Sequence, residues 1–147
     1  MAFQFTLASV LRYREGIEHN EYLALLQLQQ QIVAARKELE QLRKELNGLR
    51  NSRQAGLKQG VSASYLHVQL EIEARAEQQK DASVERLRQL NTRLQNQIKN
   101  YHKARQRRET LEILRSQQLQ AYRHDERVRE QRESDELFLL RRKRPGQ

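Results

Sequence analysis

Apolar residues recur at alternating spacings of three and four between residues 25 and 49. The stripe consists of Leu25, Leu28, Ile32, Ala35, Leu39, Leu42, Leu46 and Leu49. Because a straight α-helix makes about 3.6 residues per turn, a stripe that repeats about every 3.5 residues stays buried only when the helix supercoils around a partner. The sequence therefore predicts a coiled coil, with a partner helix from this chain or from another copy.

The composition favours an all-α protein over a globular one. The 147 residues include one proline, Pro145, and five glycines, so long stretches contain no helix breaker. Hydrophobic residues make up only 37% of the chain and charged residues 32%, which suits one narrow apolar stripe per helix better than a globular core. We expect two long helices that form an antiparallel coiled-coil hairpin, with helix 2 longer than helix 1.

The heptads lapse between residues 51 and 60, where Gly56 and Gly60 permit irregular backbone. We therefore expect a single coiled-coil rod with helix 1 over residues 5–52, a turn over 53–61, helix 2 over 62–140 and a basic tail over 141–147. Ser62 or Ser64 is suited to cap the start of helix 2, because a hydroxyl accepts hydrogen bonds from free backbone amides there.

The predicted facing seam on helix 2 consists of Val84, Leu87, Leu94, Ile98 and Tyr101. Asn91 lies within this seam and is interpreted either as a tolerated polar interruption or as a residue that fixes the register.

Helix 2 is expected to extend well beyond helix 1. With a turn centred near residue 57, paired positions sum to about 114, so that Phe5 lies opposite a residue near 109. Helix 2 then continues without a partner for about 30 residues, or roughly 45 Å. Past Tyr101 the seam spacing falls on charged residues, namely Arg105, Arg108, Glu112 and Arg115, whereas Leu111, Leu114 and Leu119 lie on a shifted face. An intramolecular partner is not required there.

A second apolar strip follows the turn on a different face of helix 2 from Leu66, Leu70 and Ala74. It consists of Tyr65, Val68, Ile72 and Ala76. A two-stranded coil buries only one stripe, so the other is expected to be a docking surface for a second protein, unless the hairpin tip bends and the loop covers it.

The formal net charge is +9, and residues 101–147 carry 13 Lys or Arg against 8 Asp or Glu. Arg141, Arg142, Lys143 and Arg144 follow directly on the apolar run 137–140. Such a surface suits nucleic acid, an anionic membrane or an acidic protein cavity. Nucleic acid is disfavoured because glutamates alternate with the arginines and the aromatic residues form no stacking platform. A basic coiled-coil module that binds nucleic acid or an anionic membrane remains the alternative.

The sequence contains no pattern typical of an enzyme. Cysteine is absent, and the four histidines lack the i, i+4 spacing of a helical metal site. No glycine-rich phosphate loop follows a strand, so we expect no catalytic residue, cofactor or metal. No apolar run reaches the roughly 20 residues that span a bilayer, and residues 1–13 lack a signal-peptide core. A cytoplasmic protein is expected.

Both ends of the chain carry a family resemblance. The start combines Phe3-Gln4-Phe5-Thr6-Leu7 with residues 10–15, Val-Leu-Arg-Tyr-Arg-Glu, and Glu18; the end combines residues 108–112, Arg-Glu-Thr-Leu-Glu, with Tyr122, Glu130-Gln131 and Asp135-Glu136-Leu137. These patterns resemble the FliJ family of flagellar export proteins. The closing basic run is more basic than is usual in that family.

The resemblance implies a cytoplasmic component of the flagellar type III export system, peripherally associated with the inner-membrane export apparatus. Its coiled coil would be similar to the central stalk of a rotary ATP synthase. The implied partners are the hexameric export ATPase, the export-gate membrane protein and export chaperones; injectisome relatives share this architecture.

Combined with the overhang and the strip, the resemblance assigns residues to two partner-binding surfaces. The ATPase would contact the start of helix 1 and residues between 105 and 140, represented by Arg105, Arg108, Leu111, Leu114, Leu119, Tyr122, Asp135 and Glu136. The gate or a chaperone would contact Tyr65, Val68, Ile72 and Ala76. We expect a monomeric hairpin; a homodimeric spacer, in which the stripe 25–49 pairs between chains, is the alternative.

Overall fold

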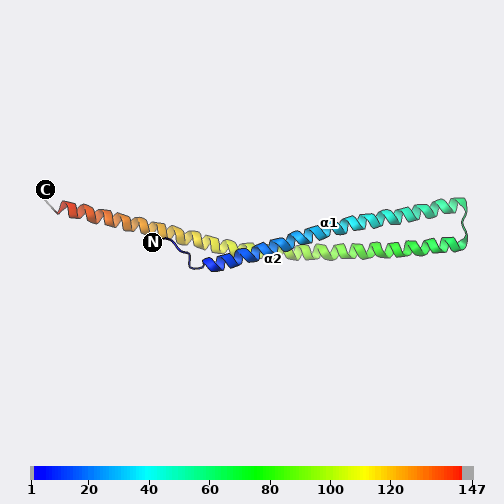
Figure 1. Cartoon of the computed structure of the whole chain (residues 1–147), viewed down its shortest axis with the longest axis horizontal. Coiled ribbons are helices and arrows are strands. Elements are labelled where there is room, and N and C mark those ends of the chain that lie inside the picture. The colour runs from blue at the N-terminus through cyan, green and yellow to red at the C-terminus, as the bar shows by residue number, and fades with distance from the viewer. Residues whose placement is uncertain (1, 144–147) are drawn as a thin grey trace. The chain divides into compact units, whose positions relative to one another are not determined.

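The computed structural model describes residues 2–143 and consists of two α-helices (Figure 1). Helix α1 spans Ala8–Gln59 and helix α2 spans Ala63–Arg142. The described residues contain no strand, so the predicted all-α fold with a longer second helix is confirmed. Met1 and residues 144–147, which include most of the predicted basic tail, lie outside the described part of the chain.

The chain divides into two compact units. The hairpin unit, Asn20–Tyr101, contains the turn between the helices; the terminal unit combines the residues up to His19 with those from His102 onward. In the hairpin unit the two helices run antiparallel on either side of the turn, with α1 in cyan and α2 in green (Figure 1).

The core of the hairpin unit forms on the predicted stripe of α1. Ile32 and Ala35 pack with Leu90 of α2 into a buried cluster. Leu28, Leu87 and Leu94 pack against this cluster, and Leu39 and Leu46 are also buried. The alternating spacing from residue 25 to residue 49 therefore marks the buried face of α1.

The predicted seam of α2 is correct in part. Leu87 and Leu94 lie in the core as predicted, and Tyr101 contacts Tyr22 at 6.0 Å between ring centroids. Ile98 and Asn91 are half-buried. The prediction for Val84 is wrong.

Val84 is 40% exposed, whereas its neighbour Ser83 is buried and Leu90 is only 4% exposed. The seam follows alternating spacings of four and three from Ser83 through Leu87 and Leu90 to Leu94. This register places the small polar serine inside and turns the larger apolar valine outward.

The turn lies later in the chain than the sequence predicted. Helix α1 ends at Gln59 rather than near residue 52, and α2 begins at Ala63. Gly56 does not break the helix: a Cβ atom there would lie 3.3 Å from Cγ1 of Val61, so the glycine lets the turn pack closely against α1. Among the described residues only Gly60 has a positive φ, of 86°, which glycine adopts at little cost.

The hydroxyl of Ser62 accepts a hydrogen bond from the amide of Tyr65 at 3.2 Å, as expected for a helix cap.

The later turn shifts the pairing of the helices. The residue numbers of contacting pairs sum to 126 or 127 for Arg50 with Glu77, Arg53 with Glu73, and Glu18 with Arg108. The predicted sum of about 114 is therefore wrong, and so is the pairing of Phe5 with a residue near 109. The part of α2 that has no partner is correspondingly shorter.

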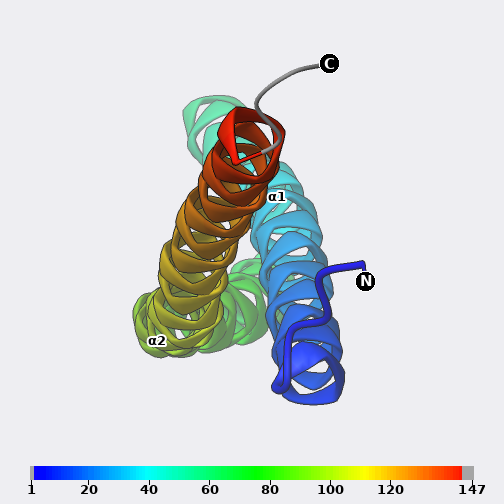
Figure 2. The same ribbon diagram turned by 90° about the vertical axis from the view of Figure 1, so that its left-hand side faces the viewer.

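Residues 2–7 of the terminal unit precede α1 and are not helical (Figures 1 and 2). Phe3 contacts Tyr122 of α2, with ring centroids 5.6 Å apart and planes inclined by 48°. Phe5 is buried, as are Leu11 of α1 and Ala104 of α2. The N-terminal segment thus packs on α2 and extends the partnered part of that helix to Tyr122.

Candidate partner-binding surfaces

Arg108, predicted to be part of an unpartnered surface, instead joins the helices of the terminal unit. Its Nε and Nη2 atoms donate to the two carboxylate oxygens of Glu18 at 2.5 and 3.2 Å, and Nη1 donates to Glu112 at 2.7 Å. The side chains of Arg108 and Glu18 are only 20% and 17% exposed. The hydrogen bonds that Arg108 donates to Glu18 raise the pKa of Arg108 above its ordinary value, and burial opposes this rise. The forked pair fixes α1 against α2.

The predicted surface residues between 111 and 122 are half-buried. They are Leu111, Leu114, Leu119 and Tyr122. The Tyr122 hydroxyl donates to Glu126 at 2.8 Å, and this hydrogen bond raises the pKa of Tyr122. These side chains therefore contribute to packing within the unit as well as to its surface. Arg105 is more exposed and forms an ion pair with Glu109 at 2.9 Å.

Every described residue after Glu126 is exposed, and we call residues 127–143 the C-terminal segment. Asp135 accepts a hydrogen bond from Gln131 at 3.2 Å, and Glu136 is exposed, so both residues lie on an accessible helix surface. In the terminal unit this segment is the part of α2 that packs on no other element.

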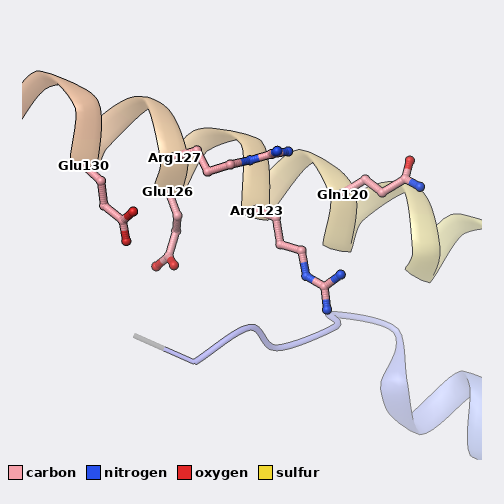
Figure 3. Close-up of a pocket in the computed structure, with 5 residues that line it drawn as sticks. All are labelled: Gln120, Arg123, Glu126, Arg127 and Glu130. Atoms are coloured by element: carbon pink, nitrogen blue, oxygen red, sulfur yellow. The ribbon is translucent and has the colours of Figure 1, made fainter.

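A groove of about 480 Å³ lies where the C-terminal segment begins, lined by Gln120, Arg123, Glu126, Arg127 and Glu130. Figure 3 shows Arg123 extending toward the N-terminal segment, with the carboxylates of Glu126 and Glu130 on the same side of α2. Arginine and glutamate side chains together give the groove mixed charge. Such a lining suits polar contacts with another protein more than the binding of an apolar ligand.

The apolar strip after the turn is exposed in the hairpin unit. Tyr65, Val68 and Ile72 are 52%, 50% and 45% exposed, and we call these three residues the tip strip. The alternative in which the loop covers them does not occur. Ala76 is half-buried, three residues after Glu73 and four before Lys80. It therefore lies on the face of α2 that packs on α1 and does not belong to the tip strip.

The seam beneath the tip strip is polar, a feature that the sequence pattern did not predict. Nε of Arg53 donates to Glu73 at 2.9 Å, with side chains 27% and 11% exposed. Glu77 accepts from Lys80 and from Arg50, each at 2.8 Å. The hydrogen bond from Lys80 lowers the pKa of Glu77, and the charges of Lys80 and Arg50 act in the same direction.

Gln69 continues this polar seam toward the turn. Its Nε2 donates to the Tyr65 hydroxyl at 3.1 Å, while its Oε1 is buried without a hydrogen-bond partner among the described residues. One sequence feature could have indicated this polar seam. Gln69, Glu73, Lys80 and Ser83 follow coiled-coil spacing along α2. At the tip, polar groups therefore lie between the helices and apolar groups lie outside.

Within residues 2–143, no three histidine, aspartate or glutamate side chains gather closely enough to hold a metal ion. Neither α1 nor α2, as far as it is described, contains an apolar stretch that could cross a membrane.

Comparison with known families identifies the chain. The family described as "Flagellar FliJ protein" matches residues 3–147, which is nearly the whole sequence. No curated protein and no solved structure matches significantly. The match confirms the resemblance of both ends of the chain and agrees with the helical fold. The chain therefore belongs to the FliJ family, and with it to the components of the flagellar protein export apparatus.

Proposed function

We propose that this chain is a non-enzymatic, stalk-like coiled coil that engages the hexameric export ATPase through its C-terminal segment. The same chain would link the ATPase to the export gate and to export chaperones through the tip strip. Family membership supports a role in flagellar export, and the observation that carries the ATPase proposal is the exposure of residues 127–143 on α2. The protein would act in the cytoplasm, peripherally associated with the export apparatus at the inner membrane.

The chemistry of the C-terminal segment supports contact with a ring that changes conformation. Arg127, Arg129 and Arg132 alternate with Glu130, Glu133 and the pair Asp135-Glu136. Exposed ion pairs contribute little stability individually, so contacts of this kind can exchange without a large barrier. A continuous apolar face would instead hold a rotating or asymmetric partner in one position.

We divide the predicted residues between two roles according to the packing of the terminal unit. Arg105, Asp135 and Glu136 are exposed, and we assign them direct contact with the ATPase. Arg108 and Tyr122 hold the N-terminal part of the chain against α2. Leu111, Leu114 and Leu119 are half-buried beside them. We propose that these three leucines, with Arg108 and Tyr122, position the C-terminal segment. Only their exposed edges would touch the ATPase.

Binding to the ATPase tests this assignment. The full chain and a chain that ends at Glu126 are immobilised and incubated with native cytoplasm, and a hexamer-forming ATPase is sought among the retained proteins. The full chain should retain it and the shortened chain should not. Retention by both chains would contradict the assignment. Because Phe3 still has its partner Tyr122 in the shortened chain, loss of binding is not expected to arise from loss of packing.

The tip strip is tested with the double substitution Val68→Asp/Ile72→Asp. Both side chains are about half exposed, so the substitution places charge on the surface without opening the core. We expect the variant to bind the ATPase and to lose the gate protein or the chaperones in pull-down experiments. Val84→Asp, at another exposed valine of α2, is the matched control and should keep both partners. If the tip variant also keeps both, the tip strip is not the second surface.

A further inference from the structure

The last turns of α2 carry an apolar cluster that the polar contacts proposed for the ATPase do not use. Leu137, Phe138, Leu139 and Leu140 are 58%, 65%, 52% and 60% exposed. Successive helical residues are about 100° apart, so four consecutive apolar residues surround the helix instead of forming a stripe. No second helix can cover such a cluster from one side.

Basic residues follow the cluster directly. Arg141, Arg142 and Lys143 are exposed, and Arg144 comes next in the sequence, outside the described residues. One helix face upstream is also free of acidic residues. At spacings of four, three and four it contains Arg127, Gln131, Ser134 and Phe138, and it continues to Arg141 and Arg142. This face, which we call the basic face, combines an aromatic residue with three cations.

We propose that the C-terminal end of α2 binds the surface of an anionic lipid bilayer. Interfacial helices bury their apolar side chains only about 5–10 Å into the boundary between headgroups and acyl chains, so a short apolar cluster beside basic residues suits this position. Arginine and lysine bury their aliphatic stems while their charged ends reach lipid phosphates, so Arg141, Arg142 and Lys143 lie where phosphates are bound. The surface is complementary to the membrane in both charge and polarity.

The acidic residues near the cluster define the orientation. Glu133 and Glu136 lie away from the basic face. Glu130 and Asp135 border it on its two sides, and Asp135 accepts a hydrogen bond from Gln131. The helix therefore meets the lipid with Phe138, Arg141 and Arg142. Leu137 and Leu139 lie at the two edges of this face, and Leu140 lies on the side of Glu136.

A membrane explains the cluster better than nucleic acid does. Phosphodiesters attract the arginines, but a nucleic acid backbone offers no hydrocarbon in which Phe138 and its flanking leucines can be buried. A bilayer offers both a phosphate layer and an apolar interior within a few ångströms.

The test uses the full chain and vesicles without any ATPase, so its result is independent of the proposed export function. Sedimentation is measured with phosphatidylcholine vesicles and with vesicles that also contain phosphatidylglycerol. Leu137→Ser/Phe138→Ser removes apolar contacts, and Arg141→Gln/Arg142→Gln removes charge. The matched controls on α2 are Ile113→Ser, which is 59% exposed, and Lys103→Gln/Arg107→Gln.

The chain should sediment only with the anionic vesicles, and raising the salt from about 0.1 M to about 0.5 M should reduce binding. Each C-terminal variant should bind roughly tenfold more weakly or worse, and each control should bind like the original chain. Circular dichroism should show unchanged helicity, because every substituted residue is exposed.

Three results would overturn the proposal: no sedimentation, an equal loss in the controls, or full binding by Leu137→Ser/Phe138→Ser. The last result would mean attraction by charge alone, and double-stranded DNA in place of the vesicles would then distinguish a nucleic acid site.

Discussion

At the scale of single residues, partly buried ion pairs set the register of the helices. Arg108 donates to both carboxylate oxygens of Glu18 and also to Glu112. A forked arginine–carboxylate pair constrains geometry more than a single contact does, because the guanidinium is planar and its donors are fixed. Arg53 and Glu73 form a similar partly buried pair in the hairpin unit. These pairs place charge where an apolar seam residue would normally lie.

Replacing Arg108 with Gln should lower the free energy of unfolding by about 1–3 kcal/mol, because Glu18 then loses its charged partner in a partly buried site. Urea denaturation followed by circular dichroism measures this difference. Arg88→Gln is the control: its pair with Glu85 is exposed, so the expected change is much smaller. Equal effects of the two substitutions would show that the Glu18 pair has no special role.

Stability should fall in acid. Hydrogen bonds from Lys80 and from Arg88 lower the pKa values of Glu77 and Glu85, respectively, below the ordinary value of 4.5. A carboxylate with a lowered pKa in the folded state stabilises the fold above its unfolded pKa, and this contribution is lost as the pH falls through the folded value. The melting temperature should therefore decrease below about pH 4.5. In Glu77→Gln/Glu85→Gln the decrease should be shallower; a decrease of unchanged steepness would contradict this origin.

At the scale of the helices, the corrected seam of α2 decides which substitutions matter. Leu90 is buried in the cluster with Ile32 and Ala35, whereas Val84 is exposed. Leu90→Ala should lower the free energy of unfolding by about 2–4 kcal/mol, because the change leaves a cavity in the packed core. Val84→Ala should cost less than about 1 kcal/mol. Thermal or urea unfolding distinguishes the two variants. A larger loss of stability for Val84→Ala than for Leu90→Ala would support the register predicted from the sequence instead.

The glycines differ by their backbone conformation. Gly60 has φ of 86°, where a side chain is strained, so Gly60→Ala should destabilise the turn by about 1 kcal/mol. Gly16 lies inside α1 with open space where a Cβ atom would be added, and Gly16→Ala should stabilise the helix by about 0.5–1 kcal/mol. Melting temperatures of the two variants should move in opposite directions. A shift in the same direction would contradict this account of the turn.

The sequence predicted the helices better than it predicted their pairing. The stripe around Ile32 and Leu39 was recognisable because apolar residues repeat at coiled-coil spacing. The facing positions Ser83 and Glu73 were not recognisable, because polar residues at seam spacing look like an exposed face until their partners are known. The contact of Glu18 with Arg108 joins residues 90 positions apart, and no local pattern encodes it.

The predicted partner surfaces show the same limit. The tip strip was recognisable because apolar residues share a face that a two-stranded coil leaves exposed. The packing of Tyr122 against Phe3 was not recognisable, because it depends on a turn position that was predicted too near the N-terminus. The residues that bind the ATPase remain a prediction.

At the scale of the whole molecule, the chain satisfies its coiled-coil stripe internally. Ile32 and Ala35 of α1 pack against Leu90 of α2, so α1 does not need a second chain. We expect a monomer of 17.6 kDa in solution at all accessible concentrations. Light scattering coupled to gel filtration measures the mass. A mass that doubles as the concentration rises would favour the homodimeric alternative.

The central claim is that residues 127–143 of α2 act on the export ATPase. ATP hydrolysis by the purified ATPase is measured with equal amounts of the full chain, the chain that ends at Glu126, and Val68→Asp/Ile72→Asp. The full chain and the tip variant should raise the hydrolysis rate equally, and the shortened chain should leave it at the basal value. Equal stimulation by the shortened chain would contradict the claim.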